Sequence, residues 1–156
     1  MKKYNLLGSY SNSKIKRIAN ENTRTINERI IASYRDKNLF DGERRFGYGG
    51  FKYDGRWIPI AKRICKTYNL NNNSSILQLG CEKGFLMHDI KTLYPKIKIY
   101  GIEMSNYAIK KSIKSVKKNI KLGNYTRLNF KNNKFDFFIS LGVVYSLNLS
   151  DAIKCL

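Results

Sequence analysis

The chain has 156 residues, 42% hydrophobic and 13% aromatic, which suffices for the core of one compact domain and excludes wholesale disorder. No apolar run approaches the roughly 20 residues of a membrane span, and no apolar stretch follows the basic start, so neither a membrane protein nor a secretory signal is expected. The net charge of +19 suits a nucleic-acid partner. However, most of the excess is Lys, and the chain is also rich in Asn, Ile and Tyr. These residues share AT-rich codons, so the base composition of the genome explains much of the charge.

Residues 1–58 are predicted to be a loosely attached helical extension that ends in a loop. Apolar residues recur at helical spacing in two short stretches, Ile15–Ala19 and Ile26–Tyr34. The stretch Phe46–Trp57 is rich in Gly and Tyr. Clustered Gly predicts a loop, and its aromatic residues must either pack down or cover something.

Residues 59–156 are predicted to form a Rossmann-like α/β domain that is incomplete at its C-terminus. Strand–helix–strand units of this length imply parallel pairing through right-handed crossovers, and apolar strands imply helices on both faces of a partial sheet of about four strands. The expected strands are Ser75–Leu79, Lys98–Ile102, Ile120–Leu122 and Phe135–Leu141. The expected helices are Ile58–Tyr68, Phe85–Tyr94, one capped by Ser105 that runs through Val116, and one that begins at Ser150.

A turn flanked by glycines follows the first predicted strand. Gly80 would let the chain turn sharply, and Gly84 would let the next helix pack close to the strand. Glu103 stands at the end of the second strand, about 20 residues on, where a carboxylate suits the two hydroxyls of a ribose. Turn and acid together predict a nucleoside site at the carboxyl edge of the sheet, although each alone is also explained by a ligand-free turn or a solvated strand end.

Three further polar residues have side chains that are common in active sites: Arg56, His88 and Asp136. Arg56 can pair with a cofactor or substrate carboxylate through its planar guanidinium. The alternative is that the loop has only a structural role, in which Tyr53 and Trp57 pack it against the sheet. His88, the single histidine, is expected on a helix surface or in packing rather than as a general base. Asp136 is expected to start the fourth strand rather than to act in catalysis.

Four segments in the second half of the chain resemble, in the right order, the motifs of class I S-adenosylmethionine-dependent methyltransferases. Ile76–Phe85 resembles the first motif, and Tyr100–Ser105 is similar to the second. Gly123–Tyr125 followed by Asn129–Phe130 resembles the segment that reaches the adenine, and Phe135–Ser140 resembles the strand that passes the methionine end. The resemblance implies methyl transfer from S-adenosylmethionine.

The resemblance also implies which residues bind the cofactor. Gly80, Cys81 and Gly84 would frame its methionine and ribose portion through backbone atoms, and Glu103 would hold the ribose hydroxyls. Ser140 would line the floor near the sulfonium.

The adenine would be bound by the segments that follow the second and third strands. Met104 would lie against its face, Asn124 would meet its amino group, and Tyr125 would lie beside the ring.

The sequence departs from the family pattern at two residues and in its length. Gln78 stands where the family has an acid that interacts with the methionine ammonium, so it would bind that group without a charge. Glu82 stands where the family prefers glycine, and its side chain would crowd the cofactor unless it points to solvent. The family sheet has more strands than the four expected here, so we interpret the chain as a fragment of a longer product.

The sequence leaves the acceptor and the catalytic residues open. We expect a small-molecule acceptor, and no catalytic base or metal site can be identified. One alternative is a truncated or degenerate cofactor-binding module without turnover. A second is a nicotinamide dehydrogenase, disfavoured because no further glycine completes the G-x-G-x-x-G rhythm. A third, weaker alternative is nucleic-acid binding by the basic residues. Three cysteines without C-x-x-C spacing predict reduced thiols in a cytoplasmic protein.

Overall fold

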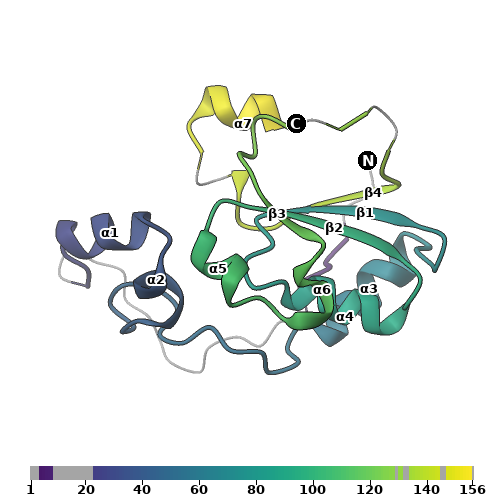
Figure 1. Cartoon of the computed structure of the whole chain (residues 1–156), viewed down its shortest axis with the longest axis horizontal. Coiled ribbons are helices and arrows are strands. Elements are labelled where there is room, and N and C mark those ends of the chain that lie inside the picture. The colour runs from purple at the N-terminus through teal and green to yellow at the C-terminus, as the bar shows by residue number, and fades with distance from the viewer. Residues whose placement is uncertain (1–3, 9–22, 129, 132–133, 145–146, 156) are drawn as a thin grey trace.

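A parallel four-stranded sheet organises the fold (Figure 1). The computed structural model describes residues 4–8, 23–128, 130–131, 134–144 and 147–155, so the predicted apolar face at Ile15–Ala19 lies outside the described residues. The strands are β1 (Ser75–Leu79), β2 (Lys98–Glu103), β3 (Ile120–Leu122) and β4 (Phe137–Ser140), in the order β3-β2-β1-β4. The predicted α/β class and partial parallel sheet are confirmed.

The strand order reverses at β1. The chain steps from β1 to β2 to β3 in one direction, and β4 then pairs with the other side of β1. In the ladder, Gln78 of β1 lies between Gly101 of β2 and Ile139 of β4. Ligands of open α/β sheets bind beyond the carboxyl ends of the strands at such a reversal. The crevice is therefore expected above Gln78 and Leu79.

The two faces of the sheet are covered differently. The helices are α1 (Ile26–Ser33), α2 (Lys37–Asp41), α3 (Ile58–Thr67), α4 (Phe85–Leu93), α5 (Asn106–Lys110), α6 (Lys114–Lys117) and α7 (Leu149–Cys155). Figure 1 shows α3, α4 and α6 on one side of the sheet and α7 on the other. The main core lies on the first side, whereas Tyr125 and Val143 of the loops pack on the second. Among the described residues, no helix is both long and apolar enough to cross a bilayer.

The helix predicted from Ser105 through Val116 is divided in two. Ser105 caps α5 by accepting from the Ala108 amide, as expected, but α5 ends at Lys110. Ile113 is extended, and its amide donates to the Lys83 carbonyl oxygen at 3.0 Å. The Ile113 amide thus bonds to the glycine turn and not within a helix. Ile113 and Val116 still pack against the core.

The N-terminal extension is firmly attached, so the expectation of a loose attachment is wrong for its described second half. Lys83, which is 5% exposed, contacts both carboxylate oxygens of Asp41 at 2.7 Å and donates to the Phe51 carbonyl at 2.8 Å. Tyr107 donates to the same Asp41 carboxylate at 2.8 Å. Phe40 is fully buried beside the rings of Phe51 and Tyr107. A buried charge with these partners fixes the extension against the sheet domain.

We predict that Asp41→Ala destabilises the protein by about 3 kcal/mol, because it leaves the Lys83 ammonium buried without its counter-charge. Urea unfolding followed by circular dichroism measures the change. Asp54→Ala is the matched control, since it removes a carboxylate from an ion pair with Arg56 that is exposed on both sides. Asp54→Ala should lower the free energy of unfolding by less than about 1 kcal/mol. Equal losses in the two variants would contradict the anchoring role of Asp41.

Candidate functional site

The turn after β1 needs glycine at both of its flanking positions. Gly80 has φ +63°, and a Cβ there would lie 2.4 Å from Cγ2 of Val143. Gly84 has φ +76°, and a Cβ there would lie 2.8 Å from Cγ2 of Val116. The sharp bend expected at Gly80 is therefore present, whereas the close approach at Gly84 is to α6 and β3 and not to β1. Glu82 between them also has a positive φ, +53°, which side chains rarely adopt.

A pocket of about 360 Å³ lies over this turn. Its floor comes from the end of β1, the glycine turn and the loop after β4, and its opposite wall comes from the N-terminal extension. The lining residues are Arg35, Leu39, Tyr48, Phe51, Trp57, Gln78, Gly80, Cys81, Glu82, Phe85, Leu86, Leu141, Gly142 and Val143. Gln78 is 5% exposed, and its Oε1 is buried with no hydrogen-bond partner among the described residues. A buried acceptor of this kind is a position where a donor of a ligand can bind.

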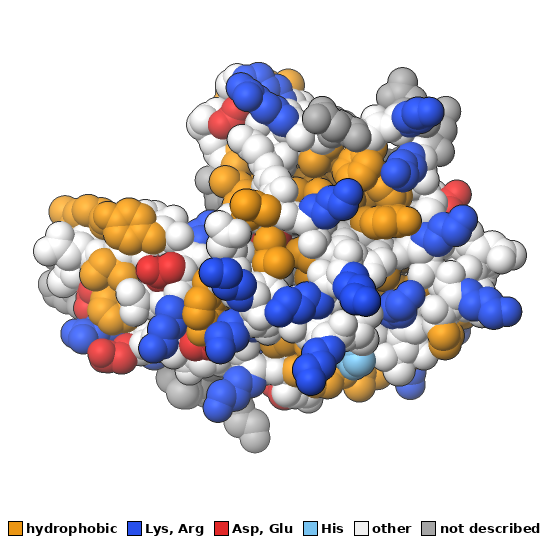
Figure 2. Space-filling model, viewed as in Figure 1, with side chains coloured by type: hydrophobic (Ala, Val, Ile, Leu, Met, Phe, Trp, Pro, Cys, Tyr) orange, Lys and Arg blue, Asp and Glu red, His pale blue; other side chains and the backbone are white. Residues whose placement is uncertain are grey.

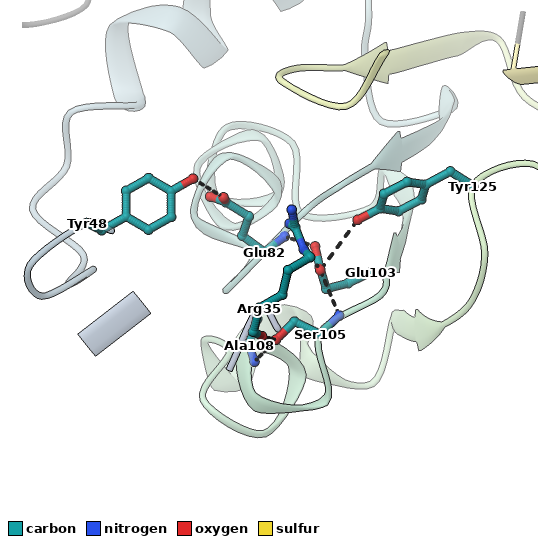
Figure 3. A network of polar contacts seen from close by, with 7 residues as sticks. All are labelled: Arg35, Tyr48, Glu82, Glu103, Ser105, Ala108 and Tyr125. Carbon is teal, nitrogen blue, oxygen red and sulfur yellow. Dashed lines mark hydrogen bonds and ion pairs between the residues drawn. The ribbon is translucent and has the colours of Figure 1, made fainter. Parts of the chain in front are cut away.

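Glu103 joins the end of β2 to the glycine turn (Figure 3). Its Oε2 accepts from the Glu82 amide at 2.8 Å, and its Oε1 accepts from the Ser105 amide at 2.8 Å. The Tyr125 hydroxyl donates to Oε1 at 3.4 Å. The Glu103 side chain is fully buried. The predicted juxtaposition of Glu103 with the Gly80 bend is therefore present.

Arg35 covers Glu103 from the side of the extension, and sequence analysis missed it. Its Nη2 lies 3.6 Å from Glu103 Oε1, and its carbonyl oxygen accepts from the Ser105 hydroxyl. The Arg35 Nε is buried and has no partner among the described residues. A φ of +51° turns the chain sharply just after α1 and aims this side chain at the pocket. Arg35 follows no apolar period or spaced motif, so the sequence carries no signal for it.

Glu82 lines the pocket and is partly exposed. The Tyr48 hydroxyl, across the pocket, donates to its Oε1. Burial raises the pKa of Glu82 to about 7, the Tyr48 hydrogen bond opposes this rise, and the nearby Glu103 charge adds to it. The side chain therefore takes up space over the glycine turn, and its pKa lies near neutral pH.

Other predicted site residues do not line the pocket. Met104 is 46% exposed, and Asn124 is exposed with its Oδ1 accepting from the Thr126 amide at 2.9 Å. The Ser140 Oγ is buried, and within the described chain it has no partner. Arg56 instead forms a fork with Asp54, with Nε and Nη2 at 2.8 and 2.5 Å from Oδ2.

Tyr53, His88 and Asp136 have structural contacts. Tyr53 donates to Asp89 at 2.5 Å, and Trp57 lines the pocket, which fits both expectations for this loop. His88 Nδ1 lies 2.8 Å from the Ser115 hydroxyl and does not line the pocket. Asp136 accepts from the Ser75 amide at 2.7 Å and ties the start of β4 to β1. In the ranges described, no three His, Cys, Asp or Glu side chains are grouped to hold a metal ion.

The fold and the glycine turn define a Rossmann-like domain with a pocket at the reversal of its strand order. Residues 70–155 match the family described as a methyltransferase domain, and the chain belongs to that family. No curated protein matches the chain.

Several solved structures share the fold. A putative S-adenosylmethionine-dependent methyltransferase from Methanococcus maripaludis has a TM-score of 0.53 at 17% identity, over 63% of this chain and 47% of that one. An amino pentose methyltransferase from Micromonospora echinaspora, with S-adenosylmethionine bound, has a TM-score of 0.52 at 16% identity, over 64% and 43%. A putative methyltransferase from an antibiotic biosynthesis pathway of Anabaena variabilis has a TM-score of 0.51 at 19% identity, over 61% and 38%. The chain thus matches less than half of each of these proteins.

We predict that Glu82 makes the protein less stable as the pH rises. The pKa of Glu82 lies above its ordinary 4.5 in the folded state, at about 7. The folded state therefore holds a proton that the unfolded state releases between these values, so the free energy of unfolding falls as the pH rises through this window. Glu82→Gln should lack this part of the pH dependence in urea unfolding.

The exposed Glu43 offers a matched control. Glu43→Gln should keep the wild-type pH profile, because it removes the same charge without removing a buried carboxyl. An unchanged profile in Glu82→Gln would show that Glu82 is solvated rather than enclosed by Tyr48.

Proposed function

We propose that the pocket binds S-adenosylmethionine and that the protein transfers its methyl group to a small-molecule acceptor. The observation that carries the proposal is the buried Oε1 of Gln78, which has no partner in the part of the chain that the structure describes. It lies at the reversal of strand order, next to the turn that contacts Glu103. Membership of the methyltransferase domain family supports the same conclusion.

The polar groups around the pocket fit the chemical groups of this cofactor. Gln78 Oε1 would accept from the methionine ammonium, although as a neutral amide it supplies no counter-charge. Ser140 Oγ is buried at the end of the neighbouring strand without a partner among the residues described, and it would offer a second hydrogen bond. Glu103 would accept from the ribose hydroxyls, because each carboxylate oxygen can accept more than the one short amide bond it has here. The site thus offers acceptors for the cationic and hydroxylated parts of the ligand.

The adenine would extend from the ribose toward the loop after β3. Met104 follows Glu103 directly and exposes 46% of its surface, so it can lie against an aromatic ring. Tyr125 is buried with its hydroxyl toward Glu103, and Asn124 next to it is exposed. We therefore propose that Met104, Asn124 and Tyr125 contact the adenine.

Access to Glu103 requires Arg35 to move. Glu103 has no exposed surface, since Arg35 lies over it and the Glu82 and Ser105 amides lie beside it. We infer that Arg35 competes with the ribose for the carboxylate and leaves it when the cofactor enters. The Arg35 side chain is 31% exposed, so its guanidinium can turn to solvent, and the ribose hydroxyls would take its place at the buried Glu103 carboxylate.

When bound, the cofactor supplies a methyl group already activated by its sulfonium, so the protein has mainly to position the reactants and exclude water. The wall formed by Tyr48, Phe51 and Trp57 would exclude water from above the turn. Burial strongly raises the pKa of Cys81, which keeps its thiol neutral and unsuited to act as a nucleophile.

A small-molecule acceptor and a cytoplasmic location complete the proposal. The pocket is enclosed by the N-terminal extension, and one structure of similar fold is an amino pentose methyltransferase. The free thiols of Cys65 and Cys81 suit a reducing compartment.

We predict opposite effects on cofactor affinity from Glu103→Gln and Arg35→Gln. Glu103→Gln removes the charged acceptor of the ribose hydroxyls and should weaken S-adenosylhomocysteine binding about tenfold or more in calorimetry. Arg35→Gln removes the competing cation and should tighten binding about threefold. Glu43→Gln, at the surface, should leave affinity unchanged.

If Glu103→Gln binds S-adenosylhomocysteine as tightly as the wild type, the ribose does not bind at Glu103. If Arg35→Gln binds it more weakly, Arg35 contacts the cofactor and does not compete with it. Turnover is tested separately, by release of S-adenosylhomocysteine from S-adenosylmethionine with pooled small-molecule metabolites. Binding without release would favour a cofactor-binding module that does not transfer methyl groups.

A further inference from the structure

The positive charge of the chain is concentrated in one part of the fold. Residues 91–134 contain 12 Lys and Arg residues and a single acid, the buried Glu103, a formal charge of +11. Residues 23–57, by contrast, contain eight basic and five acidic residues. A uniform codon bias would enrich both segments alike, so it does not account for the difference.

Six lysines of this segment lie on consecutive elements at one edge of the sheet. We call them the basic strip: Lys110, Lys111, Lys114, Lys117, Lys118 and Lys121. They belong to α5, α6, the residues next to these helices, and the edge strand β3. Figure 2 shows the Lys and Arg side chains spread over the face where Figure 1 places α5, α6 and β3.

The basic strip is exposed and lacks counter-charges. All six side chains are exposed, and none forms an ion pair with an acid in the described part of the chain. One of them, Lys117, donates to the Lys110 carbonyl at 2.7 Å. The backbone beneath is fixed, because Ala108, Val116 and Ile120 are buried. The charges repel one another on a rigid support, and a polyanion laid across them would relieve this repulsion.

We propose that the basic strip binds the phosphate backbone of a nucleic acid. Lysine ammonium groups neutralise phosphates and release the counterions condensed on the nucleic acid, which drives such binding. The proposal does not depend on methyl transfer, since no residue of the strip lines the pocket.

An anionic membrane is a poorer partner for this surface. A helix that lies on a membrane inserts large apolar side chains between its basic residues. The apolar residues between these lysines face inward instead: Val116 is buried, and Ile109 and Ile113 pack against the core. Leu122, next to Lys121, is 55% exposed, but one isolated apolar side chain is not the apolar face that a membrane-bound helix inserts into lipid.

Base-specific recognition is not expected from this surface. Tyr107, the aromatic residue of α5, is half-buried and donates to Asp41, so it does not offer a ring for base stacking. Contacts from lysine alone position a protein on a nucleic acid without reading its sequence. A DNA duplex of any sequence is thus a suitable probe.

The test is fluorescence anisotropy of a labelled short DNA duplex with the whole chain at several salt concentrations. Six phosphate contacts predict a slope of about −5 for the logarithm of the association constant against that of salt. Absence of binding at low salt would overturn the proposal, as would equal or tighter binding to vesicles that contain phosphatidylserine.

Matched variants separate the strip from net charge. Lys114→Glu with Lys118→Glu reverses two charges of the strip four residues apart, and Lys62→Glu with Lys66→Glu does the same on exposed positions of α3. Both variants change the net charge equally. We expect the strip variant to weaken binding about tenfold more than the α3 variant and to make the salt slope shallower by about 2. Equal losses, with circular dichroism confirming that both variants fold, would show that total charge and not the strip binds the duplex.

Discussion

The hydrogen bonds from the Glu82 and Ser105 amides to the Glu103 carboxylate hold the site together. Through them one buried side chain joins the end of β2, the glycine turn after β1 and the start of α5. A buried carboxylate is costly unless it is paired, so these bonds define the positions of both loops. The pocket over the turn exists because three backbone segments converge on this group.

The N-terminal extension completes the pocket and also restricts it. The Asp41–Lys83 ion pair fixes the extension to the glycine turn, and Tyr48 and Arg35 then reach across to Glu82 and Glu103. The two acids of the site are thus partnered by residues from a single segment far away in sequence. Cofactor affinity should therefore depend on contacts within the extension as much as on the sheet.

The sheet was predictable from the sequence because its signals are local. The apolar run Ser75–Leu79, the glycines around it and the acid that ends β2 each follow from spacing within a few residues. Arg35 and Tyr48 were not predictable, since their partners lie 68 and 34 residues away and no period marks them. The chemistry of Arg56 predicts a place in the site, and the structure shows that it donates to Asp54, two residues before it.

Hydrogen exchange of the backbone amides with and without S-adenosylhomocysteine tests the central claim most directly. A ligand that occupies the pocket and bonds to Glu103 must slow the exchange of amides in Gly80–Gly84 while leaving those of α3 unchanged. If saturating ligand leaves the exchange of Gly80–Gly84 as fast as in the free protein, the nucleoside does not bind at this turn and the assignment of the site is wrong.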